Sequence, residues 1–396
     1  MIKKALFFLL LFVFGIQNSF AQKQTLFLDK DFYAAVLQSK VEKKPIVLML
    51  YATWCAHCNK MKNEIFTDAD VINYYSKNFI CVAVDAESQN GIDLKNRFKS
   101  KFKVKFYPTF AFLDSDENVL NCISGESKKE DFLNEAKNTL ISEKQFTTLK
   151  STYFNDVSNA ENCLKYITAV RKCGLDATEI AEKYLQTKTE NDWFTEQNWK
   201  IIANGINTID SYEIKFVNLH KDEFAKVSSP IRVEKKLVFV TSDNLKPLVD
   251  LNDTINYYKL KPIAASFKIR KVDSLLFKYD LQLYENNKNW KSYKATAKNA
   301  IEKFAWKDSN TLVEVATFYL NFITDKSSLD DAINWTKQAL TLGESLDKYT
   351  LLSKLYLIEK DQMNALAYAK KGKETALKYG WKTEEIDKLI LEIKKQ

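Results

Sequence analysis

Apolar runs alternate with amphipathic stretches in the first part of the chain. The runs at 46–51 and 79–85 are almost entirely apolar and have the length of strands, which is typical of strands buried on both faces of a sheet. Stretches with apolar residues on one side predict helices between and after them. The predicted helices lie at 31–43, 55–66, 71–77, 91–101 and after Gly125, and two short predicted strands lie at 109–113 and 119–123. This order predicts a compact α/β domain.

Strand patterns become sparse after about residue 150, so the remainder of the chain is predicted to be helical. The segments Ala332–Ala339 and Ala365–Gly372 both carry small residues seven positions apart, and they begin 33 positions apart (365 − 332). That period is typical of tetratricopeptide-type helix pairs, in which small residues let neighbouring helices approach closely. A generic antiparallel helix bundle is the alternative. We predict an α/β domain at 22–145, a helical domain at 150–290 and tetratricopeptide-like repeats at 291–396.

The first 21 residues predict a signal peptide. Lys3 and Lys4 precede an apolar run at 5–16 that is too short to span a bilayer comfortably. Small residues around Ala21 then predict cleavage before Gln22. An uncleaved anchor is the alternative. We expect an exported, soluble protein in the periplasm or otherwise outside the cytoplasm, without stable membrane insertion after cleavage, where disulfides persist.

Charge and histidine content exclude some functions. The formal charge is +8, from 59 basic and 51 acidic residues, but the two signs are interleaved, as at 128–131. Interleaved charges indicate solvated helix surface and no nucleic-acid partner. The chain contains only two histidines, His57 and His220, so it has few ligands for a zinc site. We therefore expect no metal and no organic cofactor.

Among the six cysteines, only Cys55 and Cys58 have a spacing, Cys-x-x-Cys, that is typical of a reactive thiol pair. Both lie where a predicted helix begins after a buried strand, and unpaired N–H groups at such a helix start favour an anion. We therefore expect a lowered pKa for the Cys55 thiol, so that its thiolate is the attacking group and Cys58 is the resolving thiol. His57 is expected to stabilise that thiolate, which makes the disulfide more oxidising. The alternatives are a static structural disulfide or half a zinc site.

Two motifs carry a family resemblance. The segment Trp-Cys-Ala-His-Cys at 54–58, with Tyr-Pro-Thr at 107–109 downstream, resembles the thioredoxin superfamily over about 24–143. The resemblance implies a thioredoxin-like fold, followed here by the all-α region. It also implies that the Tyr107–Pro108 bond is cis and that its loop abuts the active-site cysteines.

The resemblance further implies how a substrate is held. Tyr107 would pair its backbone with an extended substrate chain, and Thr109 would begin the next strand. Trp54, Tyr107, Pro108 and Thr109 are the predicted substrate-binding residues. The Cys-Ala-His-Cys and Tyr-Pro-Thr motifs look like disulfide isomerase domains, whereas the long helix after Cys58 looks more like periplasmic reductase domains. The direction of exchange therefore stays open between reductase, oxidase and isomerase.

The chain departs from the family at one buried position. Family members usually carry a buried acid six residues before the first cysteine, paired with a lysine on the adjacent strand. Here Met49 and, by alignment, Ala83 occupy these places. No internal base for Cys58 is evident, and water or Lys105 are the candidate substitutes.

The other four cysteines are expected to have structural roles. Cys81 and Cys122 lie in predicted strands and are interpreted as small core residues. Cys163 and Cys173 lie in one predicted helix, where ten residues separate them by ~15 Å, too far for a disulfide.

The predicted function is thiol–disulfide oxidoreductase, acting on protein thiols and disulfides through Cys55 and Cys58. The helical region is expected to offer a surface for a protein partner. The alternative is an interaction protein whose helical repeats carry the function, with the thioredoxin fold kept as a scaffold. An intact thiol pair argues against this alternative, because a scaffold does not need one.

Overall fold

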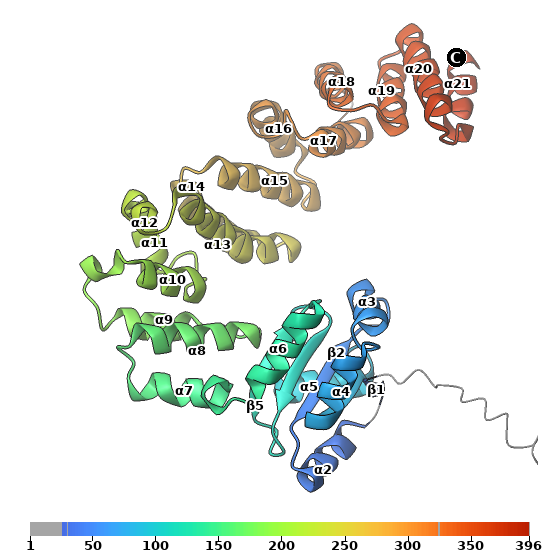
Figure 1. Cartoon of the computed structure of the whole chain (residues 1–396). Coiled ribbons are helices and arrows are strands. Elements are labelled where there is room, and N and C mark those ends of the chain that lie inside the picture. Colours follow the sequence, from blue (N-terminus) through green and yellow to red (C-terminus); the bar gives the residue numbers. More distant parts are fainter. Residues whose placement is uncertain (1–25, 30, 324, 396) are drawn as a thin grey trace, which may run out of the picture. The chain divides into compact units, whose positions relative to one another are not determined.

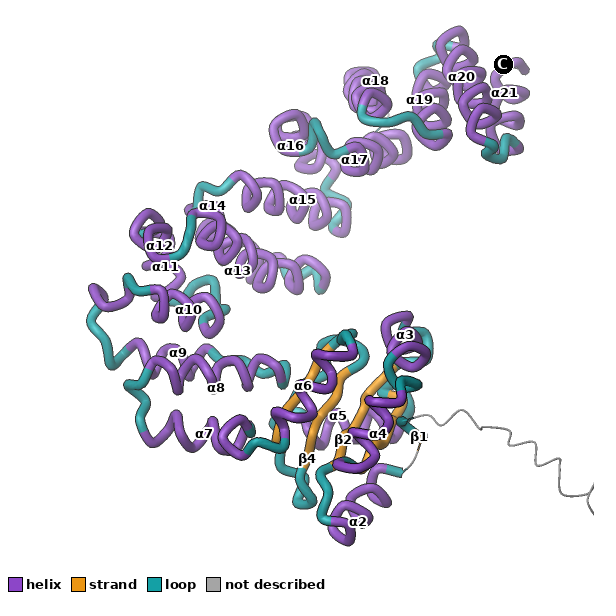
Figure 2. The backbone as a smooth tube through the Cα atoms, viewed as in Figure 1, coloured by secondary structure: helices purple, strands orange, loops and turns teal. Residues whose placement is uncertain are grey.

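The computed structural model of the chain describes residues 26–29, 31–323 and 325–395 (Figures 1 and 2). The predicted signal peptide at 1–21 lies outside the described residues and stays a prediction. Within the described ranges, no helix is both long and apolar enough to cross a bilayer. The chain divides into two compact units, Met1–Ile206 and Asn207–Gln396.

A five-stranded sheet with the order β1-β3-β2-β4-β5 forms the centre of the first unit. β3 pairs in parallel with β1 and β2, whereas β4 pairs antiparallel with β2 and β5. The strands are β1 (Leu28–Asp29), β2 (Ile46–Tyr51), β3 (Ile80–Asp85), β4 (Thr109–Leu113) and β5 (Val119–Ser124). The four predicted strands are confirmed to within one residue at each end. The pattern did not indicate β1, because two residues are too few to show a period.

Helices cover both faces of this sheet. They are α2 (Phe32–Glu42), α3 (Ala56–Glu64), α4 (Ala69–Asn78), α5 (Gln89–Phe98) and α6 (Lys129–Thr139). Side chains of α3, α4 and α6 share one apolar cluster with the sheet, and those of α2 and α5 share the other. The predicted helix at 91–101 begins earlier, at Gln89, because the Ser88 side chain caps it by accepting the Gly91 N–H.

Further helices continue the first unit beyond the sheet. They are α7 (Phe146–Asn155), α8 (Ala160–Lys172), α9 (Thr178–Leu185) and α10 (Glu196–Gly205). α7 and α8 contact the edge strand β5, which is why the first compact unit extends to Ile206. The domain boundaries predicted after residues 145 and 290 stay predictions.

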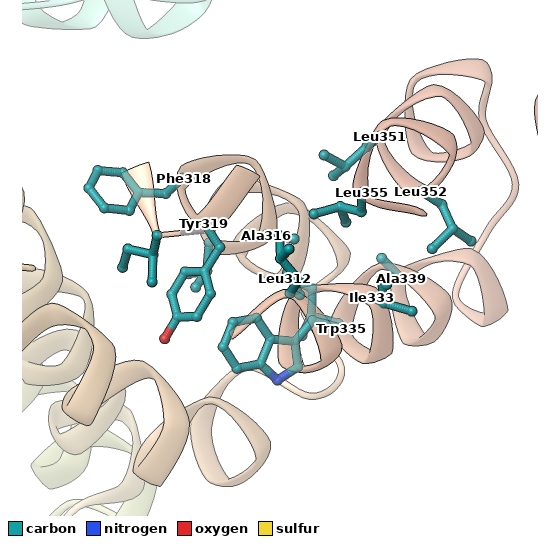
Figure 3. Close-up of a cluster of buried hydrophobic side chains, with 14 of the residues drawn as sticks. Leu312, Ala316, Phe318, Tyr319, Ile333, Trp335, Ala339, Leu351, Leu352 and Leu355 are labelled. Carbon is teal, nitrogen blue, oxygen red and sulfur yellow. The ribbon is translucent and has the colours of Figure 1, made fainter. Parts of the chain in front are cut away.

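Helices make up the described part of the second unit. They are α11 (Tyr212–Leu219), α12 (Lys221–Val227), α13 (Pro230–Asp250), α14 (Thr254–Ser266), α15 (Arg270–Asn286), α16 (Trp290–Phe304), α17 (Ser309–Phe322), α18 (Lys326–Thr341), α19 (Leu346–Ile358), α20 (Gln362–Tyr379) and α21 (Glu384–Lys395). Consecutive helices bury apolar side chains against one another: Leu312 of α17, Trp335 of α18 and Leu352 of α19 belong to one cluster (Figure 3). The predicted succession of an α/β fold and an all-α region is confirmed.

The small residues of the internal repeat are buried at equivalent places. Ala332 and Ala339 lie in α18, and Ala365 and Gly372 lie two helices later in α20. A Cβ atom on Gly372 would lie 2.7 Å from the Cβ of Tyr349 in α19, so this contact requires glycine. The positions fit the expected role of small residues, and the tetratricopeptide-like character of the repeat stays a prediction.

Candidate redox site

Cys55 and Cys58 form a disulfide at the start of α3, and their Cα atoms are 5.3 Å apart. Cys55 is the N-cap residue of this helix, so the predicted helix at 55–66 begins one residue later than expected. Its Sγ atom accepts the backbone N–H of Cys58 at 3.1 Å. The first sulfur therefore occupies the position where unpaired helix N–H groups favour negative charge.

Both cysteines are enclosed by apolar side chains. Cys55 is 4% exposed and Cys58 is 2% exposed, and they share a cluster with Ala52 and Met61. Very little of either residue therefore reaches solvent.

His57 takes part in a hydrogen-bond network with two charged side chains on the exposed side of α3. Its Nδ1 atom lies 2.8 Å from Oε2 of Glu126, and Nζ of Lys60 lies 2.5 Å from Oε1 of the same carboxylate. The hydrogen bond from Lys60, and then that from His57, lowers the pKa of the Glu126 carboxyl, and Glu126 in turn raises the pKa of Lys60. The carboxylate thus stays ionised while holding both partners.

Sequence reasoning missed Glu126, which lies 69 positions after His57. No short-range spacing joins the two residues, because the β4–β5 hairpin lies between them. The neighbouring Gly125 donates its N–H to the Pro108 carbonyl at 2.7 Å, so one loop contacts both predicted motifs.

Trp54 precedes the disulfide and presents a large exposed side chain, with 68% of its surface accessible. Its indole N–H donates to both carboxylate oxygens of Glu87, at 3.0 and 2.9 Å. Sequence reasoning also missed Glu87, although a signal existed. β2 and β3 are parallel neighbours, so residues that follow them, such as Trp54 and Glu87, come together at one edge of the sheet.

The Tyr107–Pro108 peptide bond is cis, as the family resemblance implied. The Tyr107 ring lies edge-on to Trp54, with 5.9 Å between the ring centroids, so the two predicted motifs meet. Pro108 is buried, and Thr109 begins β4 with its hydroxyl donating to the Phe106 carbonyl at 2.7 Å. The structure therefore brings the two predicted motifs together through Trp54 and Tyr107, while the roles of their residues stay predictions.

An apolar pair occupies the place of the family's buried acid and lysine. Met49 of β2 lies directly opposite Ala83 of β3, as the alignment predicted, and both are buried. Lys105, one candidate substitute base, is exposed in the loop that leads to Pro108.

Comparisons with known proteins agree with this geometry. Residues 32–139 match the family model described as a thioredoxin-like domain. A protein disulfide isomerase-like protein of Arabidopsis thaliana is 31% identical over 90 residues, which cover 23% of this chain and 16% of that protein. A thioredoxin of Drosophila melanogaster is 26% identical over 88 residues, covering 22% of this chain and 74% of that protein.

A solved structure is also similar. The solution structure of a protein described as a putative disulphide-isomerase, from Bacteroides thetaiotaomicron, is 25% identical, with a TM-score of 0.26, and the match covers 29% of this chain and 91% of that one.

The family match, together with the Cys55–Cys58 pair, supports thiol–disulfide oxidoreductase chemistry at a general level. Residues 32–139 form a thioredoxin-like domain, which a long helical region follows along the chain.

Proposed function

We propose that this protein is an exported thiol–disulfide oxidoreductase that exchanges disulfides with protein substrates through Cys55 and Cys58. One observation carries the proposal: Cys55 caps α3 and accepts the Cys58 N–H, inside a thioredoxin-like domain. A sulfur in this position is stabilised as the thiolate, which is the reactive form.

The exchange requires two displacements. In the reduced protein, the Cys55 thiolate attacks a substrate disulfide, and one substrate sulfur leaves and takes up a proton. Cys58 then loses its proton and attacks Sγ of Cys55, which releases the second substrate sulfur and restores the Cys55–Cys58 bond. Two electrons pass from the protein to the substrate, and the reverse sequence oxidises a substrate dithiol.

Neighbouring residues have proposed supporting roles. His57 stabilises the Cys55 thiolate, and Glu126 orients the imidazole through Nδ1. Trp54 and Tyr107 form an aromatic surface beside the disulfide, on which a substrate chain docks. The cis bond at Pro108 leaves the adjoining backbone free to pair with that chain, while Thr109 holds the loop through Phe106.

Insulin reduction with dithiothreitol tests the proposal. Cys55→Ser should abolish turnover, whereas Cys58→Ser should accumulate mixed disulfides because the second displacement is missing. Cys163→Ala is the matched control, since Cys163 is a buried cysteine of α8 outside the site. If Cys55→Ser retains wild-type turnover, or Cys58→Ser traps no substrate, the exchange mechanism is wrong.

A redox titration of the Cys55–Cys58 couple would define the direction. A potential near about −270 mV, as in thioredoxin, indicates a reductase, and one near about −120 mV indicates an oxidase. The alternative function, a helical-repeat interaction protein with an idle scaffold, predicts no activity in the insulin assay and no effect of Cys55→Ser.

A further inference from the structure

The start of α3 carries the redox couple, but the first turn of this helix has no acidic residue of its own. Glu126, from the loop between β5 and α6, supplies a carboxylate there. Its Oε2 atom lies 2.8 Å from Nδ1 of His57 in the first turn, and its Oε1 atom lies 2.5 Å from Nζ of Lys60, one turn later. A negative charge is therefore held over the same helix end that favours a thiolate at Cys55.

The second motif of the site also holds Glu126 in place. The preceding residue, Gly125, donates its backbone N–H to the Pro108 carbonyl at 2.7 Å. Pro108 follows Tyr107, whose ring packs edge-on against Trp54 beside the disulfide. Side-chain contacts with α3 and a backbone contact with the cis-proline loop thus fix the Glu126 carboxylate from two sides.

The carboxylate is the least exposed member of this network. The Glu126 side chain is 30% exposed, whereas the side chains of His57 and Lys60 are 70% and 53% exposed. The hydrogen bonds from Lys60 and His57 lower the pKa of the Glu126 carboxyl, which keeps it ionised at neutral pH. Because a partly covered charge is screened less than an exposed one, the negative charge of Glu126 is screened less than the charge of Lys60.

The redox potential of a thiol pair depends on the charges around its thiolate. A basic group near the sulfur stabilises the reduced form and makes the disulfide more oxidising, and a carboxylate has the opposite effect. Lys60 and Glu126 therefore act on Cys55 with opposite signs. While both are present their charges offset each other, so the basic residues of α3 add little oxidising power to the couple.

We propose that Glu126 is a positioning residue that makes the Cys55–Cys58 couple more reducing, because its carboxylate offsets the basic groups of His57 and Lys60 at the start of α3. This inference rests on the proposed exchange function and adds the residue that biases its direction. Glu126 acts through the two basic side chains and does not itself exchange electrons or protons with the substrate.

The equilibrium between the full-length protein and glutathione tests this proposal. Two glutathione molecules reduce the Cys55–Cys58 bond to two thiols and form one molecule of oxidised glutathione. The protein is equilibrated at pH 8, where imidazole groups are ordinarily neutral, then quenched in acid, alkylated and digested with trypsin. The tryptic peptide 44–60 of the wild type contains both cysteines of the couple and no other, so its oxidised fraction gives the equilibrium constant.

Two variants that remove opposite charges should shift this equilibrium in opposite directions. Glu126→Gln keeps the size of the side chain and should make the couple more oxidising, with a change of about three- to tenfold in the equilibrium constant, or about 15–30 mV. Lys60→Met should make the couple more reducing, and the double variant should lie close to the wild type. Glu64→Gln is the matched control, since it removes a negative charge at the far end of α3, ~13 Å along the helix from Cys55, and should change the constant less than twofold.

The direction of the shifts separates a role of charge from a role in folding. Equal constants in the wild type and Glu126→Gln, or shifts of the same sign in Glu126→Gln and Lys60→Met, would overturn the proposal. The equilibrium with glutathione requires no protein substrate, so its outcome is independent of the insulin assay. A wild type that does not reduce insulin would contradict the proposed function, whatever shifts the variants show.

Discussion

The contacts that stabilise the thioredoxin-like domain join residues farther apart in the sequence than those that stabilise the second, helical unit. In the domain, side-chain hydrogen bonds join residues 69 positions apart at His57–Glu126 and 57 positions apart at Tyr75–Phe132. In the helical unit, hydrogen bonds between helices join residues from 12 positions apart, at Ser353–Ala365, to 48 positions apart, at Asn218–Ser266, and several lie between 30 and 33. Examples are Lys278–Asp308 at 30 positions, Lys294–Asp325 at 31, Gln338–Trp306 at 32 and Arg270–Lys303 at 33.

The two regions should therefore respond differently to destabilising substitutions. Contacts about one helix pair apart mean that each segment depends mainly on its immediate neighbours, so stability is close to a sum of local terms. The sheet has a shared core, in which one side chain contacts elements from both ends of the domain. Damage to the sheet should therefore affect the whole domain, and damage to the helices should remain local.

The largest expected effect comes from Phe110→Ala in β4. The Phe110 ring is fully buried and lies 5.8, 6.0 and 5.0 Å from the rings of Phe27, Phe66 and Phe132. Removing it should cost about 3–5 kcal/mol, a large share of a typical domain's stability of about 5–15 kcal/mol. Denaturant unfolding and insulin reduction should both show the loss. A variant with an unchanged unfolding midpoint and full activity would contradict the shared-core interpretation.

Leu352→Ala in α19 is the counterpart in the helical unit. Leu352 is also fully buried, so the substitution should cost about 2–5 kcal/mol. Because the cost is local, hydrogen exchange should accelerate in α17 to α21 while insulin reduction stays within about twofold of wild type. If activity falls as far as in Phe110→Ala, the two regions do not differ as described.

Asp308→Ala should have a smaller, pH-dependent effect. Asp308 is the N-cap of α17 and lies 2.8 Å from Nζ of Lys278. Burial alone would raise its pKa, but the hydrogen bonds from Lys278 and Thr311 outweigh this and lower the pKa to about 2. Losing such a cap typically costs about 0.5–2 kcal/mol.

The sign of the pH dependence follows from the lowered pKa. The folded value, about 2, is below the ordinary value of 3.8. The stabilisation is therefore fully present above about pH 4 and disappears as the pH falls towards 2. Tm measured across this range should show the gap between wild type and Asp308→Ala closing in acid, and Asp308→Asn should retain much of the cap. A gap that is constant with pH would refute the assigned ion pair.

The smallest expected effect is that of Glu87→Ala beside the redox site. The variant loses the acceptor for the Trp54 indole N–H, an exposed contact worth about 1 kcal/mol. The kcat/KM for insulin reduction should fall by less than about fivefold. Glu87→Gln, which keeps one acceptor oxygen, should lie closer to wild type. A loss as complete as that of Cys55→Ser would mean that Glu87 takes part in the reaction itself.

Sequence patterns predicted most of the sheet, because β2 to β5 each contain an apolar run, or an alternation of apolar and polar residues, that is long enough to indicate a strand. β1, with two residues, lacks such a pattern. Helix ends were less predictable, because they depend on the capping residues. Cys55 is the N-cap of α3, so this helix begins one residue later than predicted, and Ser88 is the N-cap of α5, so that helix begins two residues earlier than predicted.

The site was predictable where its residues are contiguous. Trp54 to Cys58 and Tyr107 to Thr109 are short motifs, and the structure brings them together. Glu126 and Glu87 come from other loops, and only strand pairing places them beside His57 and Trp54.

The position of α7 and α8 against β5 has a consequence for the solubility of the domain. An open strand edge is a template on which another chain can pair and aggregate. β5 is such an edge, and Phe146, Cys173 and Leu175 pack against the apolar cluster that it borders. A chain cut after residue 145 would lose these shielding residues and expose both apolar surface and a strand edge to self-association. By covering this edge, α7 and α8 should protect the domain from aggregation.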